Sequence, residues 1–414
     1  MKVRYLVSAF PTLTETFIRT EIEDHLEAGL DVDVLALHPP RDRKVLDSLS
    51  PELRRRVHFA SASRSQLDRL LAAGRAALGG RAARRALFPD EAALRSRPFD
   101  LAAAAGLWKR LGPDPDIVHA HFGRLGLAAN VLRRAGATRA KIATTFHGRD
   151  LTVLPQRRGE DVYARLLAEG DAFLPVNHAF ATRLIAMGAD ARKVHVQRAP
   201  VRAAGIAFHP PVRAPGEPVR LVCVGRLQEK KGQAVALRAL ARLVNDDPGT
   251  AYHLTIVGGG GLAESLSQLA AGLGLGERVS FLGPRPHSEI LAELSRSHVF
   301  VLPSLTGQDG DQEGVPVSIM EAMAAGLPVV STRHSGIPEL VADRVTGALA
   351  NEGDDASLAE AIAWTAAQSA DWAKMGAAAR RVVEGEFDVA ATGPRLGNLY
   401  ASLTSCEKVP QQQR

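Results

Sequence analysis

The sequence predicts an α/β protein of two domains, each organised around a doubly wound parallel sheet. The chain has 414 residues, which is too long for one ordinary hydrophobic core, so domains of about 200 residues are expected. Short apolar runs alternate with helical patterns between residues 219 and 331, as in parallel sheets whose strands are joined by helices. Glycine follows several of these runs, and histidine ends two apolar runs of the first half, at the sheet edge where α/β domains bind ligands.

The composition is that of a globular protein. Hydrophobic residues make up 46% of the chain and charged residues 23%, and no run of eighteen apolar residues could span a membrane. Cys223 and Cys406 are too few for a disulfide framework or a cysteine-based metal site, which favours a reducing compartment. We therefore expect a cytoplasmic protein, either free or peripheral on the inner face of the plasma membrane.

The first predicted domain spans residues 1–207. Its opening residues are too short for a signal peptide and are typical of a first strand. Thr12 and Glu15 have the spacing of a helix capping box, and Gly29 would end the helix that follows. The predicted elements are a strand at 1–10, a helix after 12–15, a strand at 31–37, a helical region at 64–110, and strands within 116–123 and 142–150.

Positive charge is concentrated in the first half of the chain. Residues 51–149 hold 19 Lys and Arg against 7 Asp and Glu. Aromatic residues for base stacking are scarce there and no nucleic-acid-binding motif accompanies the charge, so no nucleic-acid partner is expected. Two interpretations stay open, an anionic membrane surface as partner and a solvated basic face.

Histidines gather at two strand ends of this domain. His119 and His121 close one strand, and His147 follows the next. Three histidines could indicate zinc, but no carboxylate or cysteine stands at metal-ligand spacing beside them, so we expect no metal. The alternative for each is a hydrogen-bonded core histidine.

A Pro-rich linker at 208–218 precedes the second domain, which is predicted to span 219–388. Its four glycines at 258–261 lack the register of a dinucleotide fingerprint, so NAD is not expected. A helix at 389–404 and a disordered tail at 405–414 would close the chain. The predicted strands are 219–224, 253–257, 279–282, 299–302 and 328–331, and the predicted helices are 232–246, 262–273, 287–296, 316–325, 356–368 and 372–385.

Residues 313–330, which read EGVPVSIMEAMAAGLPVV, form the most informative stretch. Pro316 fits the first position of a helix, and Gly326 fits its end. A helix that follows a strand presents free N–H groups and a positive dipole end, which suit a phosphate. Glu313 and Glu321 are then acceptors for paired hydroxyls, although a helix-entry charge and a solvated helix residue would give the same pattern.

A second motif lies about ninety residues upstream, where residues 221–232 read LVCVGRLQEKKG. The combination of Gly-Arg-Leu, Lys-Gly and the two spaced glutamates resembles the retaining glycosyltransferases of family four. The resemblance covers nearly the whole chain and implies the GT-B fold, in which two Rossmann-like domains face each other across a crevice. It also implies that the helix at 389–404 crosses back to the N-terminal domain.

The resemblance implies roles for individual residues. Arg226 and Lys231 would stabilise the leaving diphosphate, Glu313 would hold sugar hydroxyls, Glu321 would accept from the ribose, and His147 would lie near the transferred sugar. His147, Arg226, Lys231 and Glu313 are the expected catalytic residues. The expected donor-binding residues are Gly225, Arg226, Lys231, Arg285, Glu313, Gly314, Val315, Pro316, Val317 and Glu321.

Residues 10–18, FPTLTETFI, also resemble the branch of the family that makes exopolysaccharides such as colanic acid and amylovoran. This implies transfer of a hexose from a nucleotide sugar, UDP-linked, to a saccharide or lipid-linked saccharide, with retained configuration and without a metal or other cofactor. Two alternatives remain open, a non-catalytic nucleotide-sugar-binding subunit and an enzyme acting on a soluble small-molecule acceptor. Nucleotide-sugar epimerases and phosphorylases share the two-domain fold. Phosphorylases carry a lysine for pyridoxal phosphate, whereas Lys231 lies in the diphosphate motif.

Overall fold

The chain folds into two compact units in the computed structural model, which describes residues 1–12, 15–61, 65, 68, 70–71, 73, 75, 81–86, 98–108 and 111–405. Unit 1 comprises Met1–Pro200 with Thr392–Arg414, and unit 2 comprises Val201–Ala391. The segment predicted as a linker, residues 208–218, lies in unit 2. Of the predicted disordered tail, only Ser405 lies within the described residues.

Unit 1 contains a six-stranded sheet in the order β3-β2-β1-β4-β5-β6, and all of its neighbouring strands pair in parallel. The chain begins at a central strand, proceeds to one edge and then crosses to the other side of β1, which defines a doubly wound sheet. The strands are β1 (Lys2–Ala9), β2 (Asp31–His38), β3 (Val57–Phe59), β4 (Ile117–His121), β5 (Lys141–Phe146) and β6 (Ala172–Pro175).

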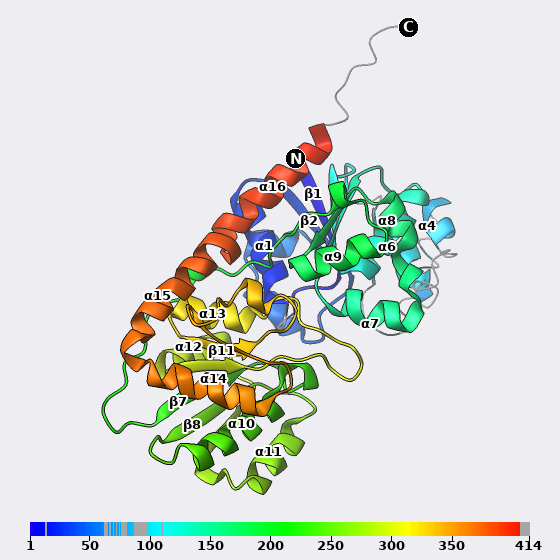
Figure 1. Cartoon of the computed structure of the whole chain (residues 1–414). Helices are drawn as coiled ribbons and strands as arrows, with labels where there is room; N and C mark the ends of the chain where they lie inside the picture. The colour runs from blue at the N-terminus through cyan, green and yellow to red at the C-terminus, as the bar shows by residue number, and fades with distance from the viewer. Residues whose placement is uncertain are drawn as a thin grey trace. The chain divides into compact units, whose positions relative to one another are not determined.

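Helices cover both faces of this sheet (Figure 1). One face packs on α1, α2 and α16, where Ile18, Ile22 and Leu396 share a core with Tyr5 of β1. The other face packs on α4, α5, α6, α8 and α9 around Trp108. Within the described residues, the helices of unit 1 are α1 (Thr16–Glu27), α2 (Pro51–Arg55), α4 (Arg81–Ala86), α5 (Pro98–Trp108), α6 (Gly123–Arg134), α7 (Arg149–Arg158), α8 (Ala164–Glu169), α9 (His178–Ala186) and, from Thr392 on, α16 (Val389–Ser405).

Unit 2 repeats the same strand order with different residues. Its sheet has the order β12-β11-β10-β7-β8-β9, again with parallel neighbours throughout. Two doubly wound Rossmann-like sheets are therefore present, which confirms the predicted fold class. The strands are β7 (Val219–Val224), β8 (Tyr252–Val257), β9 (Val279–Gly283), β10 (Val299–Leu302), β11 (Val329–Thr332) and β12 (Gly347–Ala350).

The helices of unit 2 also lie on both faces of their sheet (Figure 1). Contacts group α10 with α11 and α14, and group α12 with α13 and α15. No helix in the described part of the chain combines the length and apolar character needed to cross a membrane. The helices are α10 (Gln233–Asp246), α11 (Ala263–Gly272), α12 (His287–Arg296), α13 (Val317–Ala325), α14 (Asp355–Ala367) and α15 (Trp372–Val382).

Two helix starts differ from the sequence prediction. Pro316 is the N-cap residue of α13, not its first helical residue, because its ψ of 119° is extended. The N-cap residue of α1 is Glu15, whose side chain caps nothing, and the Thr12 hydroxyl donates to the Glu15 carboxylate at 3.1 Å. The predicted capping box at the start of α1 is therefore wrong. Strands β3 and β12 were not predicted, because β3 has only three residues and β12 (GALA) contains no β-branched residue.

Candidate functional site

The predicted donor residues of unit 2 follow its two central strands. Gly225 and Arg226 come directly after β7, and the loop that carries Glu313 follows β10. These strands are hydrogen-bonded neighbours, and the strand order reverses between them. Ligands of doubly wound sheets bind outside the carboxyl ends of the strands at this point of reversal. Topology alone thus brings the two sequence motifs to one edge of the sheet.

Lys231 is held by a single 3₁₀ turn, Glu229–Lys231, and is 9% exposed. Gly232 ends the turn in a left-handed conformation with φ of 68°. A Cβ atom on Gly232 would lie 1.8 Å from the carbonyl oxygen of Pro303, the residue after β10. Only glycine fits there, because it tolerates positive φ and lets the two backbones approach closely. The Lys-Gly pair of the motif therefore fixes where the ammonium group lies.

Glu313 is buried and ion-paired with the lysines of this turn. Its Oε1 lies 3.0 Å from Nζ of Lys231 and 3.7 Å from Nζ of Lys230. Burial alone would raise the pKa of the Glu313 carboxyl, but the charges of Lys231 and Lys230 outweigh it and hold the pKa below its usual value. Glu313 is therefore ionised and lies directly beside the ammonium group of Lys231.

The backbone of Glu313 is positioned by a histidine that the sequence did not reveal. The Glu313 N–H donates to Nε2 of His334 at 3.1 Å, and Nδ1 of His334 lies 2.7 Å from the Glu352 carboxylate. Because Nε2 accepts from an amide, the imidazole proton must be on Nδ1 and donate to Glu352. His334 is 1% exposed. The pair Glu352–His334 thus orients the loop that presents Glu313.

The acidic residues of the same loop have partners of their own. Asp311 lies 3.2 Å from Nζ of Lys230, and the Asp309 carboxylate accepts from the Asp311 N–H at 3.1 Å. Their Asp-x-Asp spacing is the one point at which this loop resembles a divalent-metal motif. The structure uses both carboxylates to hold the loop and Lys230.

Helix α13 points its first amide groups toward this edge. Gly314, Val315 and Pro316 are buried, and the Pro316 carbonyl accepts from the third and fourth amides of the helix. The N–H groups of Val317 and Ser318 at the helix start have no acceptor inside the helix, which leaves them available to an anion. The N-terminal end of α13 therefore offers donors and a positive dipole end next to Lys231 and Glu313.

Glu321, one turn further along α13, is already engaged. Its Oε1 lies 2.9 Å from Nε2 of His287, the first residue of α12. The side chain of His287 is 58% exposed, whereas that of Glu321 is 13% exposed. Hydrogen bonding to Glu321 raises the pKa of His287 above its ordinary value, although partial burial opposes this. His287 was not predicted, since a lone histidine at a helix start carries no signal without its partner.

The two predicted arginines lie at the exposed margin of unit 2. Arg226 is exposed, and the structure shows no ion pair for it within the described ranges. Arg285 follows β9, and its Nη1 lies 3.4 Å from the exposed Glu289 carboxylate. Ion pairs of this exposed kind contribute little to stability. Both guanidinium groups are thus accessible to a ligand.

His147 lies in unit 1, just after β5, and is partly buried. It packs between Phe17 and Phe122, with ring centroids 4.7 Å and 4.6 Å away, and its Nε2 lies 3.1 Å from Nδ1 of His121. Burial, together with the neighbouring His121, holds the pKa of His147 well below its ordinary value. At neutral pH the imidazole is therefore uncharged and can donate from one nitrogen and accept at the other.

His121 belongs to a buried polar group that we call the histidine cluster, made of Glu21, His119 and His121. His119 and His121 are fully buried, and Glu21 of α1 lies between them. Burial lowers the pKa of His119 to about 4. Glu21 could have been found in the sequence, since it lies on the same helical stripe as the inward-facing Ile18 and Ile22.

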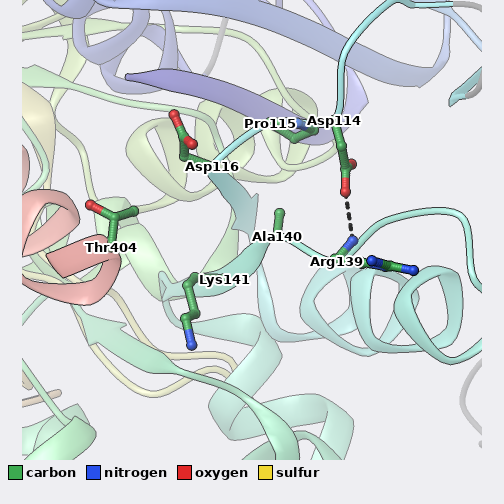
Figure 2. A pocket seen from close by; sticks show the side chains of 7 residues that line it. All are labelled: Asp114, Pro115, Asp116, Arg139, Ala140, Lys141 and Thr404. Atoms are coloured by element: carbon green, nitrogen blue, oxygen red, sulfur yellow. Dashed lines mark hydrogen bonds between the residues drawn. The ribbon is translucent and has the colours of Figure 1, made fainter. Parts of the chain in front are cut away.

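A shallow cavity of about 190 Å³ lies where β4 and β5 begin, at the other end of these strands from His121 and His147 (Figure 2). The acids beside it already accept hydrogen bonds from the protein. Asp114 accepts from the Arg139 N–H at 2.6 Å, as Figure 2 shows, and Asp116 accepts from the Lys2 N–H at 2.7 Å. This cavity is not at the ligand-binding edge. Its lining residues are Asp114, Pro115, Asp116, Arg139, Ala140, Lys141 and Thr404.

Two protein-family models match the chain in succession. The model described as Glycosyltransferase Family 4 matches residues 14–202, and the model described as Glycosyl transferases group 1 matches residues 207–382. The second match contains the turn with Lys231, the loop with Glu313 and helix α13. The first contains the histidine cluster and His147.

Relatives with curated names cover nearly the full chain. The amylovoran biosynthesis glycosyltransferase AmsK of Erwinia amylovora is 34% identical over 94% of this chain and 96% of its own length. A protein of Escherichia coli named "putative colanic acid biosynthesis glycosyltransferase WcaL" is 35% identical over 97% of this chain and 100% of its own length. These two names agree with the branch that residues 10–18 indicated.

Solved structures share the two-domain architecture. HepE of Anabaena, in complex with UDP and glucose, has a TM-score of 0.72 at 18% identity and covers 97% of this chain and 100% of HepE. The sucrose-phosphate synthase of Thermosynechococcus elongatus has a TM-score of 0.77 at 20% identity and covers 98% of this chain and 100% of the synthase. At these identities the similarity shows the fold.

Proposed function

Because the chain belongs to glycosyltransferase family 4, we propose that it transfers a hexose from a nucleoside diphosphate sugar, UDP-linked, to a saccharide acceptor with retention of configuration. Two relatives are named for amylovoran and colanic acid biosynthesis, which supports a growing exopolysaccharide unit as the acceptor. The observation that carries the donor assignment is the Lys231–Glu313 pair at the N-terminal end of α13.

The proposed chemistry follows from charge. Cleavage of the bond between the anomeric carbon and the diphosphate builds negative charge on the leaving phosphate and positive character on the sugar. Lys231, the exposed Arg226 and the first amides of α13 would stabilise the diphosphate in place of a metal ion. Glu313 would accept hydrogen bonds from sugar hydroxyls. Its ion pair with Lys231 would then be replaced by contacts of both side chains with the bound nucleotide sugar.

Glu321 would accept from the ribose hydroxyls, and Arg285 would border the base. His147 of unit 1 is a neutral hydrogen-bonding group suited to a sugar hydroxyl. Each of these roles rests on the family resemblance, and the exposure of Arg285 also supports its role. The ribose role predicts competition, because Glu321 cannot serve the ribose and a protonated His287 equally well.

We expect UDP affinity to rise with pH in the wild-type protein. Protonated His287 pairs with Glu321, and it persists to a higher pH than usual because its pKa is raised. As pH rises through that pKa, above about 6.5, the pair weakens and Glu321 becomes available. Calorimetric titration with UDP at several pH values from about 6 to about 8.5 measures this effect, because that range includes the histidine pKa.

The matched controls are His287→Gln and Glu321→Ala. The UDP affinity of the glutamine variant should depend less on pH than that of the wild type. The UDP phosphate itself titrates in this range, and it contributes equally to both proteins. The alanine variant should lose about 1–3 kcal/mol of binding free energy, because ribose hydroxyls would lack an acceptor. Unchanged UDP affinity in Glu321→Ala would remove Glu321 from the donor site.

Transfer should not require an added divalent metal. Asp311, the second acid of the Asp-x-Asp sequence in this loop, is already ion-paired with Lys230. Lys231, beside Glu313, would supply the positive charge that the diphosphate needs. Turnover measured after brief EDTA treatment should match turnover with added magnesium or manganese. Activity that is lost in EDTA and restored by either metal would instead make Asp309 and Asp311 metal ligands.

A lipid-linked acceptor would place the protein at an anionic membrane surface, attracted by the basic residues between 51 and 149, part of which lie outside the described residues. Each basic side chain near such a surface contributes about 1 kcal/mol, weakened by salt. Sedimentation with liposomes should therefore require anionic lipid and decline as salt rises. Equal binding to neutral vesicles, or none to anionic ones at low salt, would favour a soluble acceptor.

A further inference from the structure

We propose that the histidine cluster, Glu21, His119 and His121, binds a zinc ion in unit 1. The three side chains come from two elements that are distant in the sequence. Glu21 extends from α1, and both histidines extend from the same side of β4, where residues two apart share a face. One ligand atom from each lies within 4.8 Å of the other two. The proposal goes beyond the transferase function and does not depend on it.

The distances fit a tetrahedral ion. Oε1 of Glu21 lies 3.2 Å from Nδ1 of His119 and 3.4 Å from Nε2 of His121. Zinc holds oxygen and nitrogen ligands at about 2.0–2.2 Å, and in tetrahedral geometry such ligand atoms are about 3.3–3.5 Å apart. The carboxylate is therefore already spaced from each imidazole as a shared zinc ion would require. Two imidazoles and one carboxylate also form a ligand set typical of zinc, whereas magnesium and calcium prefer oxygen ligands alone.

The outer nitrogen of each histidine is held by another side chain. Nε2 of His119 lies 2.6 Å from the hydroxyl of Thr145, and Nδ1 of His121 lies 3.1 Å from Nε2 of His147. Metal-binding histidines usually make such a second hydrogen bond, which fixes the tautomer and the ring orientation. In this cluster it leaves the inner nitrogens, Nδ1 of His119 and Nε2 of His121, directed at Glu21.

Charge and hydrogen bonding give a reason for a cation. Glu21 is 5% exposed, and the ion-pair partners that the structure shows for it, within the described ranges, are the two histidines. Nε2 of His121 is buried and has no hydrogen-bond partner in the part of the chain that the structure describes. A buried carboxylate beside an imidazole nitrogen that makes no hydrogen bond is costly unless a cation or a shared proton compensates it. Zinc satisfies both groups at once.

Two phenol groups border the cluster, and one of them, Tyr5, also lies 2.7 Å from Nδ1 of His25. The Tyr5 hydroxyl donates to Glu21 at 3.0 Å, and the Tyr400 hydroxyl lies 2.5 Å from Nδ1 of His119. With zinc bound, Nδ1 of His119 would exchange this hydrogen bond for the metal, and a phenol oxygen would be near enough to complete the coordination. Without zinc, the same atoms form a hydrogen-bonded core network, which is the competing explanation.

The metal would also orient His147. A zinc ion on Nε2 of His121 requires the proton of that ring to be on Nδ1, from which it donates to Nε2 of His147. Nε2 of His147 is then an acceptor, and its own proton is on Nδ1. Zinc would thereby fix which nitrogen of His147 can donate to a ligand. His121 acts on His147 as a positioning residue.

The first test measures metal in the full-length protein, produced without a histidine tag in zinc-supplemented medium and purified without chelators. Mass-spectrometric metal analysis should find about one zinc per chain. Removal by a strong chelator should lower the melting temperature, and zinc should restore it, because a ligand that binds only the folded state stabilises it. Zinc far below one per chain, together with a melting temperature insensitive to zinc, would establish the hydrogen-bonded network instead.

Variants and a spectroscopic probe locate the ion. His121→Asn should lose the zinc, whereas His195→Asn, a matched change of an exposed histidine of unit 1, should retain it. Cobalt loaded into the stripped wild-type protein should show the intense visible bands of a tetrahedral site, and this measurement does not depend on the folding of a variant. Full zinc content in His121→Asn, or cobalt bands typical only of octahedral oxygen ligands, would overturn the assignment.

Discussion

Replacing Lys231 with alanine should lower the turnover of sugar transfer about 10²–10³-fold, the loss found when one preorganised donor to a developing negative charge is removed. The ammonium group lies at the carboxyl edge of the unit 2 sheet, 3.0 Å from Glu313, whose loop leads into α13. The neighbouring Lys230 is 3.2 Å from Asp311 and lies farther from Glu313, at 3.7 Å. Steady-state release of the nucleoside diphosphate measures the change.

Lys230→Ala is the matched control, since both lysines belong to the same turn. Its charge serves the loop through Asp311, so its loss should affect turnover much less. Lys231→Ala also leaves Glu313 buried beside a weaker partner, and a falling melting temperature could mask the chemical effect. Adding Glu313→Gln should restore stability without restoring turnover. Equal losses in the two lysine variants would contradict the assignment of Lys231 to the diphosphate.

Replacing Gly232 with alanine should abolish donor binding or prevent stable folding of unit 2. The added Cβ would meet the Pro303 carbonyl oxygen at 1.8 Å, and backbone atoms cannot yield as a flexible side chain can. The positive φ of 68° adds strain of about 1–2 kcal/mol. Relief would require the turn to move away from β10 and to carry Lys231 with it. Melting temperature and UDP affinity together measure the outcome.

Gly272→Ala is the control for this change, because a Cβ at Gly272 would meet no atom within 4 Å. It should leave both measurements close to those of the wild type. A Gly232→Ala protein that folds with unchanged UDP affinity would show that the turn can shift without cost. The link between the turn and the position of Lys231 would then be wrong.

The sequence predicted unit 2 closely because its signals are local. Apolar runs between turn residues located β7 to β11, and glycine at 326 ended α13 as expected, in a left-handed conformation with φ of 95°. The motifs that carry Lys231 and Glu313 follow central strands, so their meeting at one sheet edge could be inferred from topology. The position of Pro316 was wrong by one residue, which is the usual uncertainty of a helix end.

The residues that were missed depend on contacts between distant segments. His287, His334 and Glu21 each gain meaning from a partner on another element, respectively Glu321, the Glu313 amide and the paired histidines of β4. Glu21 alone left a sequence signal, as an acid on the buried stripe of α1. Without its position beside His119 and His121, the sequence offered no carboxylate for a metal. The expectation of no metal was made without this carboxylate and stays a prediction.

The most direct test of the donor assignment supplies the purified protein with a panel of nucleotide sugars and an acceptor extract, and follows both products by mass spectrometry. We predict that a UDP-linked sugar of the panel is used, so that UDP is released as a glycosylated acceptor appears. Both products should be lost in Lys231→Ala. Tight binding of a nucleotide sugar without turnover of any panel member would contradict the account and identify the chain as a non-catalytic nucleotide-sugar-binding subunit.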